Sequence, residues 1–186
     1  MTLIEALPGY VAGHWTLDPG HSHIGFSVRH MMVSKVRGSF TTFSGSITTA
    51  EDPLASSATL TVDLGSVDTG NDDRDAHLRS GDFFDAQSHP AMTYRTTSLR
   101  WEGGDVEVTG DLTIKDVTRP VTLVAEYNGI GADPWGGTRL GLSAHGEIGR
   151  SDFGITFNMP LDGGGVMVGE RVQLLLEVEA VLDRDA

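Results

Sequence analysis

Alternation of apolar and polar residues between His21 and Phe40 is the feature that most constrains the fold of this chain. Ile24, Phe26 and Val28 fall on one face of an extended segment, whereas the residues between them are polar or small. A period of two is typical of a half-buried β-strand. We therefore interpret the segment as two antiparallel strands that meet at a Met-rich corner.

The same alternation recurs along the rest of the chain. Alternate apolar residues share a face in residues 58–64, 106–114, 121–127, 140–148 and 172–180. One apolar face and one solvated face are typical of antiparallel sheet. The 24 glycines of the chain suit tight turns and barrel corners. We expect chain reversals at Glu102–Asp105, Asn128–Gly137 and Asp162–Gly165.

One segment, Thr69–Pro90, interrupts the strand pattern because it is too highly charged for a strand. Asn71 or Asp72 can cap a short helix that runs through Arg79. Phe83 and Phe84 would then dock this helix onto the sheet. We expect a helical insertion around residues 70–88.

About eight long strands with one helical insertion predict a single all-β domain over residues 1–186, of which residues 1–13 form a lead-in segment. The alternation alone does not choose between a closed antiparallel barrel and a two-sheet sandwich. An eight-stranded barrel can fill its interior with side chains or hold one small ligand.

Composition argues against several classes of partner. The chain carries 13 Lys and Arg against 26 Asp and Glu, a net charge of −13. Such an acidic chain is unsuited to binding nucleic acid or adhering to anionic membrane surfaces. It has no Cys, so disulfides and thiolate chemistry are excluded. No signal peptide or spanning segment is evident, and we expect a cytoplasmic protein without stable membrane insertion.

The sequence contains no nucleophile elbow, Walker A loop or dinucleotide-binding loop. His21, His23 and His30 form the one constellation that suggests a metal, since a His-x-His pair on a strand puts both rings on one face. A metal-assisted hydrolase or isomerase that uses these three residues is therefore an alternative function. No denser signature accompanies them, and we expect neither a metal site nor catalytic residues.

The apolar faces can form a filled core or line a cavity for a flexible apolar ligand. The candidate lining residues are apolar side chains that face the predicted interior or dock the insertion. They are Phe26, Val28, Met31, Phe40, Leu60, Val62, Leu78, Phe83, Phe84, Met92, Leu112, Ile114 and Phe153. The candidates for contact with a polar head group are His30, Arg74, His77 and Arg79.

Several motifs in combination resemble the YceI-like family: D-x-x-H-S at Asp18–Ser22, R-D-x-H-L-R-S-x-D-F-F at Arg74–Phe84, and G-D-L-T-I-K-x-V-T-R-P-V at Gly110–Val121. With I-G-R-S-D-F-G-I at Ile148–Ile155, the resemblance extends from Trp15 to Val181. It implies a lipocalin-like, extended eight-stranded barrel with an apolar tunnel. Many members of the family carry a signal peptide, whereas we expect none here.

The resemblance also implies a function. We expect a lipid-binding protein that sequesters or carries an isoprenoid quinone or a polyprenyl phosphate, forms a homodimer and requires no cofactor. The family has no generally established catalytic activity. The alternatives are the metal-assisted enzyme and a ligand-free stress-response protein whose core is full.

Overall fold

The computed structural model describes residues 3–102 and 104–184. The strands are β1 (Gly13–Leu17), β2 (His23–His30), β3 (Ser34–Phe40), β4 (Phe43–Thr49), β5 (Ser57–Asp63), β6 (Val67–Asp68), β7 (Ala91–Glu102), β8 (Asp105–Ile114), β9 (Val117–Ala132), β10 (Thr138–Gly149) and β11 (Val168–Leu182). The helices are α1 (Asp72–Arg79) and the short 3-10 segments η1 (Ile4–Ala6), η2 (Pro53–Ala55), η3 (Leu64–Ser66) and η4 (Arg150–Phe153).

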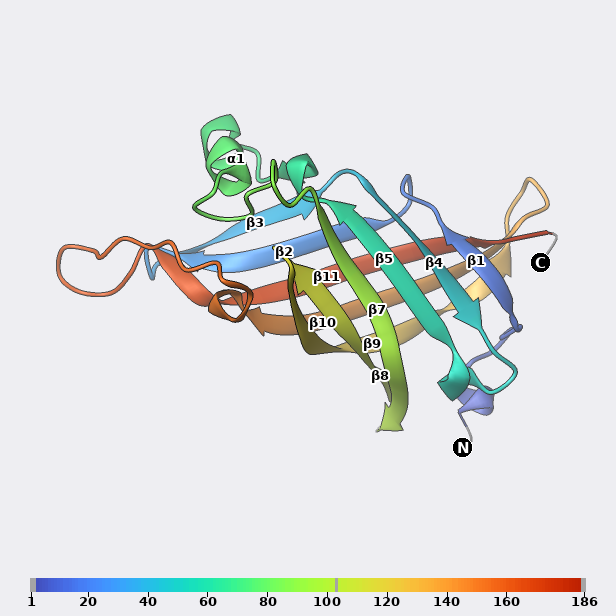
Figure 1. Ribbon diagram of the computed structural model, residues 1–186. Coiled ribbons are helices and arrows are strands. Elements are labelled where there is room, and N and C mark those ends of the chain that lie inside the picture. The colour runs from blue at the N-terminus through green and yellow to red at the C-terminus, as the bar shows by residue number, and fades with distance from the viewer. Residues whose placement is uncertain (1–2, 103, 185–186) are drawn as a thin grey trace.

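Eight of these strands close into an antiparallel barrel (Figure 1). They follow the order β1-β4-β5-β7-β8-β9-β10-β11, and β1 pairs with β11 to complete the closure. Inward-facing apolar residues alternate with outward-facing polar ones, as expected for a sheet with one buried face. The predicted all-β barrel with one helical insertion is confirmed.

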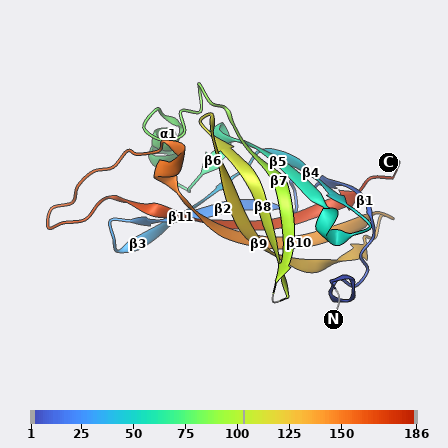
Figure 2. The same cartoon turned by 60° about the horizontal axis from the view of Figure 1, so that its bottom comes forward.

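One edge of β11 is shared by two strands. The end of β11 pairs with β1 at Leu17↔Ala180, whereas its first part pairs with β2 as far as His23↔Glu177. Because β2 continues into β3, the hairpin lies outside the barrel closure and projects from one end of the molecule (Figures 1 and 2). The segment His21–Phe40 thus forms the predicted antiparallel pair, but it adds to the barrel rather than closing it.

The insertion forms the predicted helix and covers one end of the barrel. The side chain of Asn71 caps α1 by accepting a hydrogen bond from the backbone N–H of Arg74 at 2.9 Å. Asp75 is buried and accepts hydrogen bonds from the backbone N–H and hydroxyl of Thr69 at 2.9 and 2.6 Å. Phe84 packs against Phe40 with ring centroids 5.8 Å apart. These contacts fix the helix above the barrel interior.

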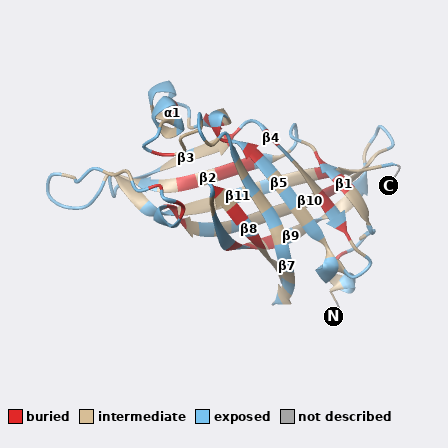
Figure 3. Ribbon diagram, viewed as in Figure 1, coloured by how far each residue is buried: buried red, intermediate tan, exposed pale blue. Residues whose placement is uncertain are grey.

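Buried side chains fill much of the barrel (Figure 3). The helix α1 and the loop between η4 and β11, which projects beside the hairpin of β2 and β3, are largely exposed. Trp15 is fully buried, and its Nε1 donates a hydrogen bond to Oγ1 of Thr49 at 2.8 Å. The lead-in segment packs across the other end of the barrel, where Leu7 is buried and the Tyr10 hydroxyl donates to the carbonyl of Ala50. Residues 1–2 of that segment lie outside the described residues.

The structure agrees with some of the chain reversals predicted at Gly-rich segments and differs from one. Asp162–Gly165 turns the chain as expected, with the N–H of Leu161 donating to the carbonyl of Gly165. Glu102 pairs with Asp105 across the predicted β7–β8 hairpin, whose Gly103 lies outside the described residues. The prediction for Asn128–Gly137 is wrong in extent, because β9 continues to Ala132.

The reason is a β-bulge. The register between β9 and β10 shifts between Gly141 and Leu142, whose partners are Gly129 and Tyr127, so Asn128 is the extra residue. Gly129 has a φ of 131°, which favours glycine. The Asn-Gly pair therefore marks a bulge, and the reversal itself is confined to Asp133–Gly137.

Within residues 3–102 and 104–184, no helix has the length and hydropathy needed to cross a bilayer.

The cap of α1 gives a first test. Asn71→Ala removes the oxygen that accepts from Arg74, and we expect it to lower the free energy of unfolding by about 1 kcal/mol. Asn71→Asp keeps an accepting oxygen and serves as the matched control, with stability near that of the wild type. Chemical denaturation measures both, and equal stability of the two variants would contradict the capping role.

Candidate functional site

The barrel holds an apolar cavity of about 120 Å³ beneath the lead-in segment, which we call the N-terminal cavity. Its wall comes from β4, β5 and β7–β10 and from the lead-in segment. Representative lining residues are Leu7, Ile47, Ala58, Val108, Ala125 and Leu142. No charged side chain of the described residues lines this cavity.

A second apolar cavity of about 100 Å³ lies beneath the insertion, and we call it the helix cavity. Nine of the predicted lining residues border it: Phe26, Val28, Phe40, Leu78, Phe83, Phe84, Met92, Ile114 and Phe153. The fold thus brings these predicted residues together around one cavity, although β2, β3, β7, β8, α1 and η4 are far apart in the chain.

A packed layer separates the two cavities. Along β8, Val106 and Val108 line the N-terminal cavity and Ile114 lines the helix cavity, whereas Gly110 and Leu112 line neither. The span from Val108 to Ile114 is about 20 Å at ~3.3 Å per residue. Three predicted lining residues, Leu60, Val62 and Leu112, pack in the apolar core and border neither cavity.

Tyr94 is the polar member of this layer. A Cβ atom on Gly110 would lie 2.4 Å from Cζ of Tyr94, so the ring rests directly on the glycine backbone. Its hydroxyl donates to the carbonyls of Val108 and Val121, which are 3.0 and 3.1 Å away. Burial, with a smaller contribution from Asp111, raises the pKa of Tyr94 to about 12. The neutral side chain therefore lies along the inner wall of the barrel, from β7 across β8 to β9.

Met31, expected among the lining residues, lies elsewhere. It begins the turn between β2 and β3 with a φ of 51°, and 47% of its surface is exposed. The turn carries its side chain beyond the last paired residues of the hairpin, so it borders neither cavity.

The candidate head-group residues hold the insertion in place. Arg74 donates from Nε to Oγ1 of Thr69 at 2.7 Å and from Nη2 to its carbonyl at 2.9 Å. Arg79 donates to the carbonyls of Gly65 and Val67 at 2.7 and 2.9 Å. Both guanidinium groups thus fasten the insertion, and their contact with a ligand stays a prediction.

The two histidines of this set are in different surroundings. His77 lies with Nε2 2.8 Å from a carboxylate oxygen of Asp82, and its ring meets those of Phe83 and Phe157 edge-on. It thus lies beside a residue of the helix cavity wall, Phe83. His30 is half-buried at the end of β2, away from α1 in sequence and outside both cavity linings.

Arg150 lines the helix cavity and was not anticipated. It is 6% exposed, and Nη1 donates to the carbonyls of Ile155 and Phe157 at 3.1 and 2.8 Å, while Nε donates to that of Gly169. Burial lowers the pKa of Arg150, and the charge of Glu170 opposes this effect. A guanidinium that is bound by carbonyls keeps its positive charge at the cavity wall. The apolar context of I-G-R-S-D-F-G-I is the sequence signal that could have identified it.

The alternative hypothesis, in which His21, His23 and His30 together hold a metal, does not fit the geometry. His23 and His30 are the first and last residues of β2, about 23 Å apart at ~3.3 Å per residue, and they face opposite sides of the strand. The structure instead brings His21 together with Asp18 and Glu179. Arg139 already occupies this group, so its guanidinium supplies the positive charge that a metal would contribute.

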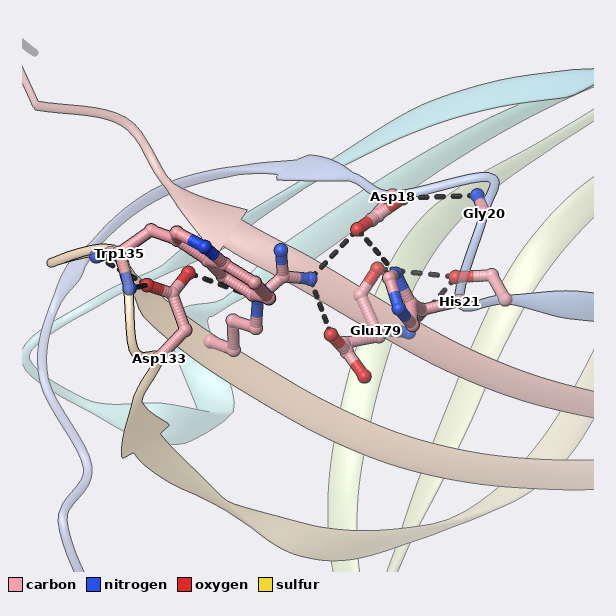
Figure 4. A network of polar contacts seen from close by, with 9 residues as sticks. Asp18, Gly20, His21, Asp133, Trp135 and Glu179 are labelled. Carbon is pink, nitrogen blue, oxygen red and sulfur yellow. Dashed lines mark hydrogen bonds and ion pairs between the residues drawn. The ribbon is translucent and has the colours of Figure 1, made fainter.

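Asp18 and Glu179, labelled in Figure 4, lie where β11 passes from one partner strand to the other, and Arg139 of β10 contacts both. Its Nη1 is 2.7 Å from Asp18 and also contacts Glu179, while its Nε is 3.1 Å from Asp133. The hydrogen bond from Arg139, assisted by His21, lowers the pKa of Asp18 to about 2. The network joins β1, β10, β11 and the β9–β10 turn.

Known proteins resemble this chain along nearly all its length. The family model described as the YceI-like domain matches residues 15–180. Protein YceI of Escherichia coli O17:K52:H18 is 40% identical over 174 residues, which cover 92% of this chain and 88% of the relative. Protein YceI of Salmonella newport is 37% identical over the same coverage.

Solved structures share the fold. Burkholderia cenocepacia BcnA superposes with a TM-score of 0.75 at 24% identity and covers 88% of this chain and 98% of its own. A polyisoprenoid binding domain from Saccharophagus degradans, implicated in plant cell wall breakdown, has a TM-score of 0.70 at 18% identity and covers 93% and 100%.

The Arg139 network predicts a loss of stability in acid. Because the pKa of Asp18 is lowered from 3.8 to about 2 in the folded state, its contribution is complete above pH 3.8 and is lost as the pH falls to about 2. We expect the stability difference between the wild type and Asp18→Asn to shrink across this interval. Unfolding curves at several pH values measure it.

A matched control is Asp162→Asn, since Asp162 is exposed and forms no ion pair within the described part of the chain. Its stability difference from the wild type should stay nearly constant over the same interval. A constant difference for Asp18→Asn as well would rule out the proposed coupling to Arg139.

Proposed function

Because this chain belongs to the YceI-like family, we propose that it binds and carries a polyisoprenoid lipid whose apolar chain occupies the two cavities of the barrel. The observation that carries the proposal is the pair of apolar cavities at opposite ends of β8. A prenyl chain has no polar atoms, so it needs continuous apolar surface and no specific hydrogen bonds. The polyisoprenoid binding domain of the same fold from Saccharophagus degradans supports this choice of ligand.

The charge of the linings supports one orientation. Arg150 borders the helix cavity, whereas the N-terminal cavity has no charged lining residue among those described. A guanidinium donates hydrogen bonds to phosphate or carbonyl oxygens. We therefore propose that the head group of a polyprenyl phosphate or isoprenoid quinone lies toward the insertion and that the chain extends toward the lead-in segment.

Binding along this path requires the separating layer to move. The cavities, of about 120 and 100 Å³, are smaller than the ~300–1,000 Å³ typical of ligand sites. A chain that reaches both must shift Tyr94 and its neighbours. Burial of a few hundred Å² of chain at about 25 cal/mol per Å² supplies several kcal/mol against this cost. Long chains should consequently gain more than short ones.

A carrier role also agrees with the chemistry of the cavity linings and of the layer between them. Arg150 stays protonated at neutral pH and cannot act as a general base. Tyr94, with its pKa raised to about 12, remains neutral and hydrogen-bonded to backbone. These groups can orient a ligand and hold it in place.

The direct experiment is organic extraction of the purified protein followed by mass spectrometry. We expect a prenyl lipid in an amount comparable to that of the protein. A protein that yields no prenyl lipid and also fails to bind added polyprenyl phosphate or isoprenoid quinone would overturn the proposal.

Filling the N-terminal cavity tests the path of the chain. Ala58 lines that cavity, and we expect Ala58→Phe to weaken binding of long prenyl chains at least tenfold, a loss of about 1.4 kcal/mol, with little effect on short ones. A series of prenyl phosphates of increasing length, measured by competition with a fluorescent probe, gives the comparison.

Thr59→Phe is the matched control, because Thr59 is exposed on the outer face of the same strand. It should leave the dependence on chain length unchanged. If Ala58→Phe weakens short and long chains equally, the ligand does not extend through the layer.

A further inference from the structure

The charges of the chain are distributed unevenly. The protein has 26 acidic residues, yet none lies between Asp18 and Glu51. This interval contains the projecting hairpin of β2 and β3, which carries Arg29, Lys35 and Arg37. The hairpin is therefore a cationic element in a chain of net charge −13.

The register of the hairpin places these cations together. Arg29 is paired directly with Lys35, and Arg37 is paired with Ser27, two residues away on the same outward face. Like charges directly opposite one another destabilise a sheet. Arg29, Lys35 and Arg37 form no ion pair with any described residue, whereas Arg100 and Arg139 elsewhere contact carboxylates. No carboxylate of the described chain thus lies within ion-pair distance of the three cations, although Glu147 and Glu170 border the same surface hollow as Arg29 and Lys35.

The tip of the hairpin is apolar. Met31, Met32 and Val33 are 47%, 53% and 85% exposed. They lie beside the loop between η4 and β11, since the N–H of Met31 donates to the carbonyl of Met167 at 2.7 Å. From this loop Met159 and Val166 are also exposed. Figures 1 and 2 both show the hairpin and the loop projecting from the same end of the molecule.

We propose that this tip docks transiently on an anionic lipid bilayer. Exposed apolar side chains flanked by Lys and Arg are the combination that enters the interface of such a bilayer, where the cations meet lipid phosphates. The net charge of the protein does not prevent this, because charges farther away than a Debye length of ~8 Å are screened at physiological salt. A symmetric contact with a second copy through the same tip would bring the cations of the two hairpins against one another, so these cations favour an anionic lipid surface as the occupant.

Docking would place the helix cavity beside the lipid. Phe26 and Val28, on the inner face of the same hairpin, line that cavity. A bilayer held at the tip thus lies next to the wall through which a lipid can enter or leave. The docking itself goes beyond the proposed function and needs no prenyl ligand.

The first experiment is sedimentation of the protein with vesicles of phosphatidylcholine, with and without phosphatidylglycerol, and without any prenyl lipid. We expect binding only to the anionic vesicles, weakened by added salt. Arg29→Gln, Lys35→Gln and Arg37→Gln in one variant should lower the affinity about a hundredfold, at roughly fivefold per cation.

The matched control combines Arg95→Gln, Arg100→Gln and Arg184→Gln. It changes the net charge equally but lies outside the hairpin, on β7 and after β11. It should bind nearly as the wild type does. Equal losses for the two triple variants, or no binding by the wild type, would overturn the proposal.

A second measurement is independent of the charge variants. The chain has no Cys, so Val33→Cys can carry a single polarity-sensitive dye, and Trp135→Cys, 80% exposed in the β9–β10 turn, provides the control. Anionic vesicles should shift the emission of the dye to the blue at position 33 but not at 135. A dye at position 33 that responds to protein concentration and not to vesicles would show a second copy on the tip and contradict bilayer docking.

Because the vesicles contain no prenyl lipid, their binding is scored separately from ligand binding. A protein that docks but yields no prenyl lipid would contradict the proposed function alone. A protein that carries the lipid but does not dock would contradict this inference alone.

Discussion

The division of one edge of β11 between β1 and β2 is the constraint on which the architecture depends. Between Leu17 and His23 neither strand continues the ladder, and the backbone of Glu179 would lose its partners there. The N–H of Asp18 and the hydroxyl of Ser22 both donate to the Glu179 carbonyl, and the Ser22 oxygen accepts from the Glu179 N–H. Buried or partly buried backbone groups are thereby satisfied without a strand.

The Arg139 network stabilises the same point with charge. Its guanidinium connects the carboxylates of Asp18, Asp133 and Glu179, which would otherwise repel one another. With the break secured, β1 can close the barrel while the hairpin extends away from it. Pairing of β1 with β11 encloses the apolar interior, and pairing of β2 with β11 attaches the projecting hairpin.

Much of this could be predicted from the sequence. The period-two pattern gave the strands and their inward faces, and the position of Asn71 gave the helix start, because both depend on residues near in the chain. The pattern could not show which strand closes the barrel, since β1 and β2 alternate alike. It also could not distinguish a bulge at Asn128 from a turn, because both favour Asn and Gly.

The candidate site could also be predicted only where it depends on residues near in the chain. Apolar residues such as Phe26 and Ile114 were found because facing inward is a property of strand position. The division of the interior was missed, as it depends on Tyr94 lying on Gly110 across two strands. Arg150 was missed because its burial depends on carbonyls of Ile155, Phe157 and Gly169 that only the folded loop brings together.

The shared edge has a consequence for local unfolding. Detachment of β2 breaks its ladder with β11 but leaves the pairs between β1 and β11 intact, so the barrel stays closed. The amide hydrogens of the hairpin can therefore exchange through an opening that costs less than global unfolding. Since this opening removes Phe26 and Val28 from the wall of the helix cavity, it would expose that cavity from the side while the barrel stays folded.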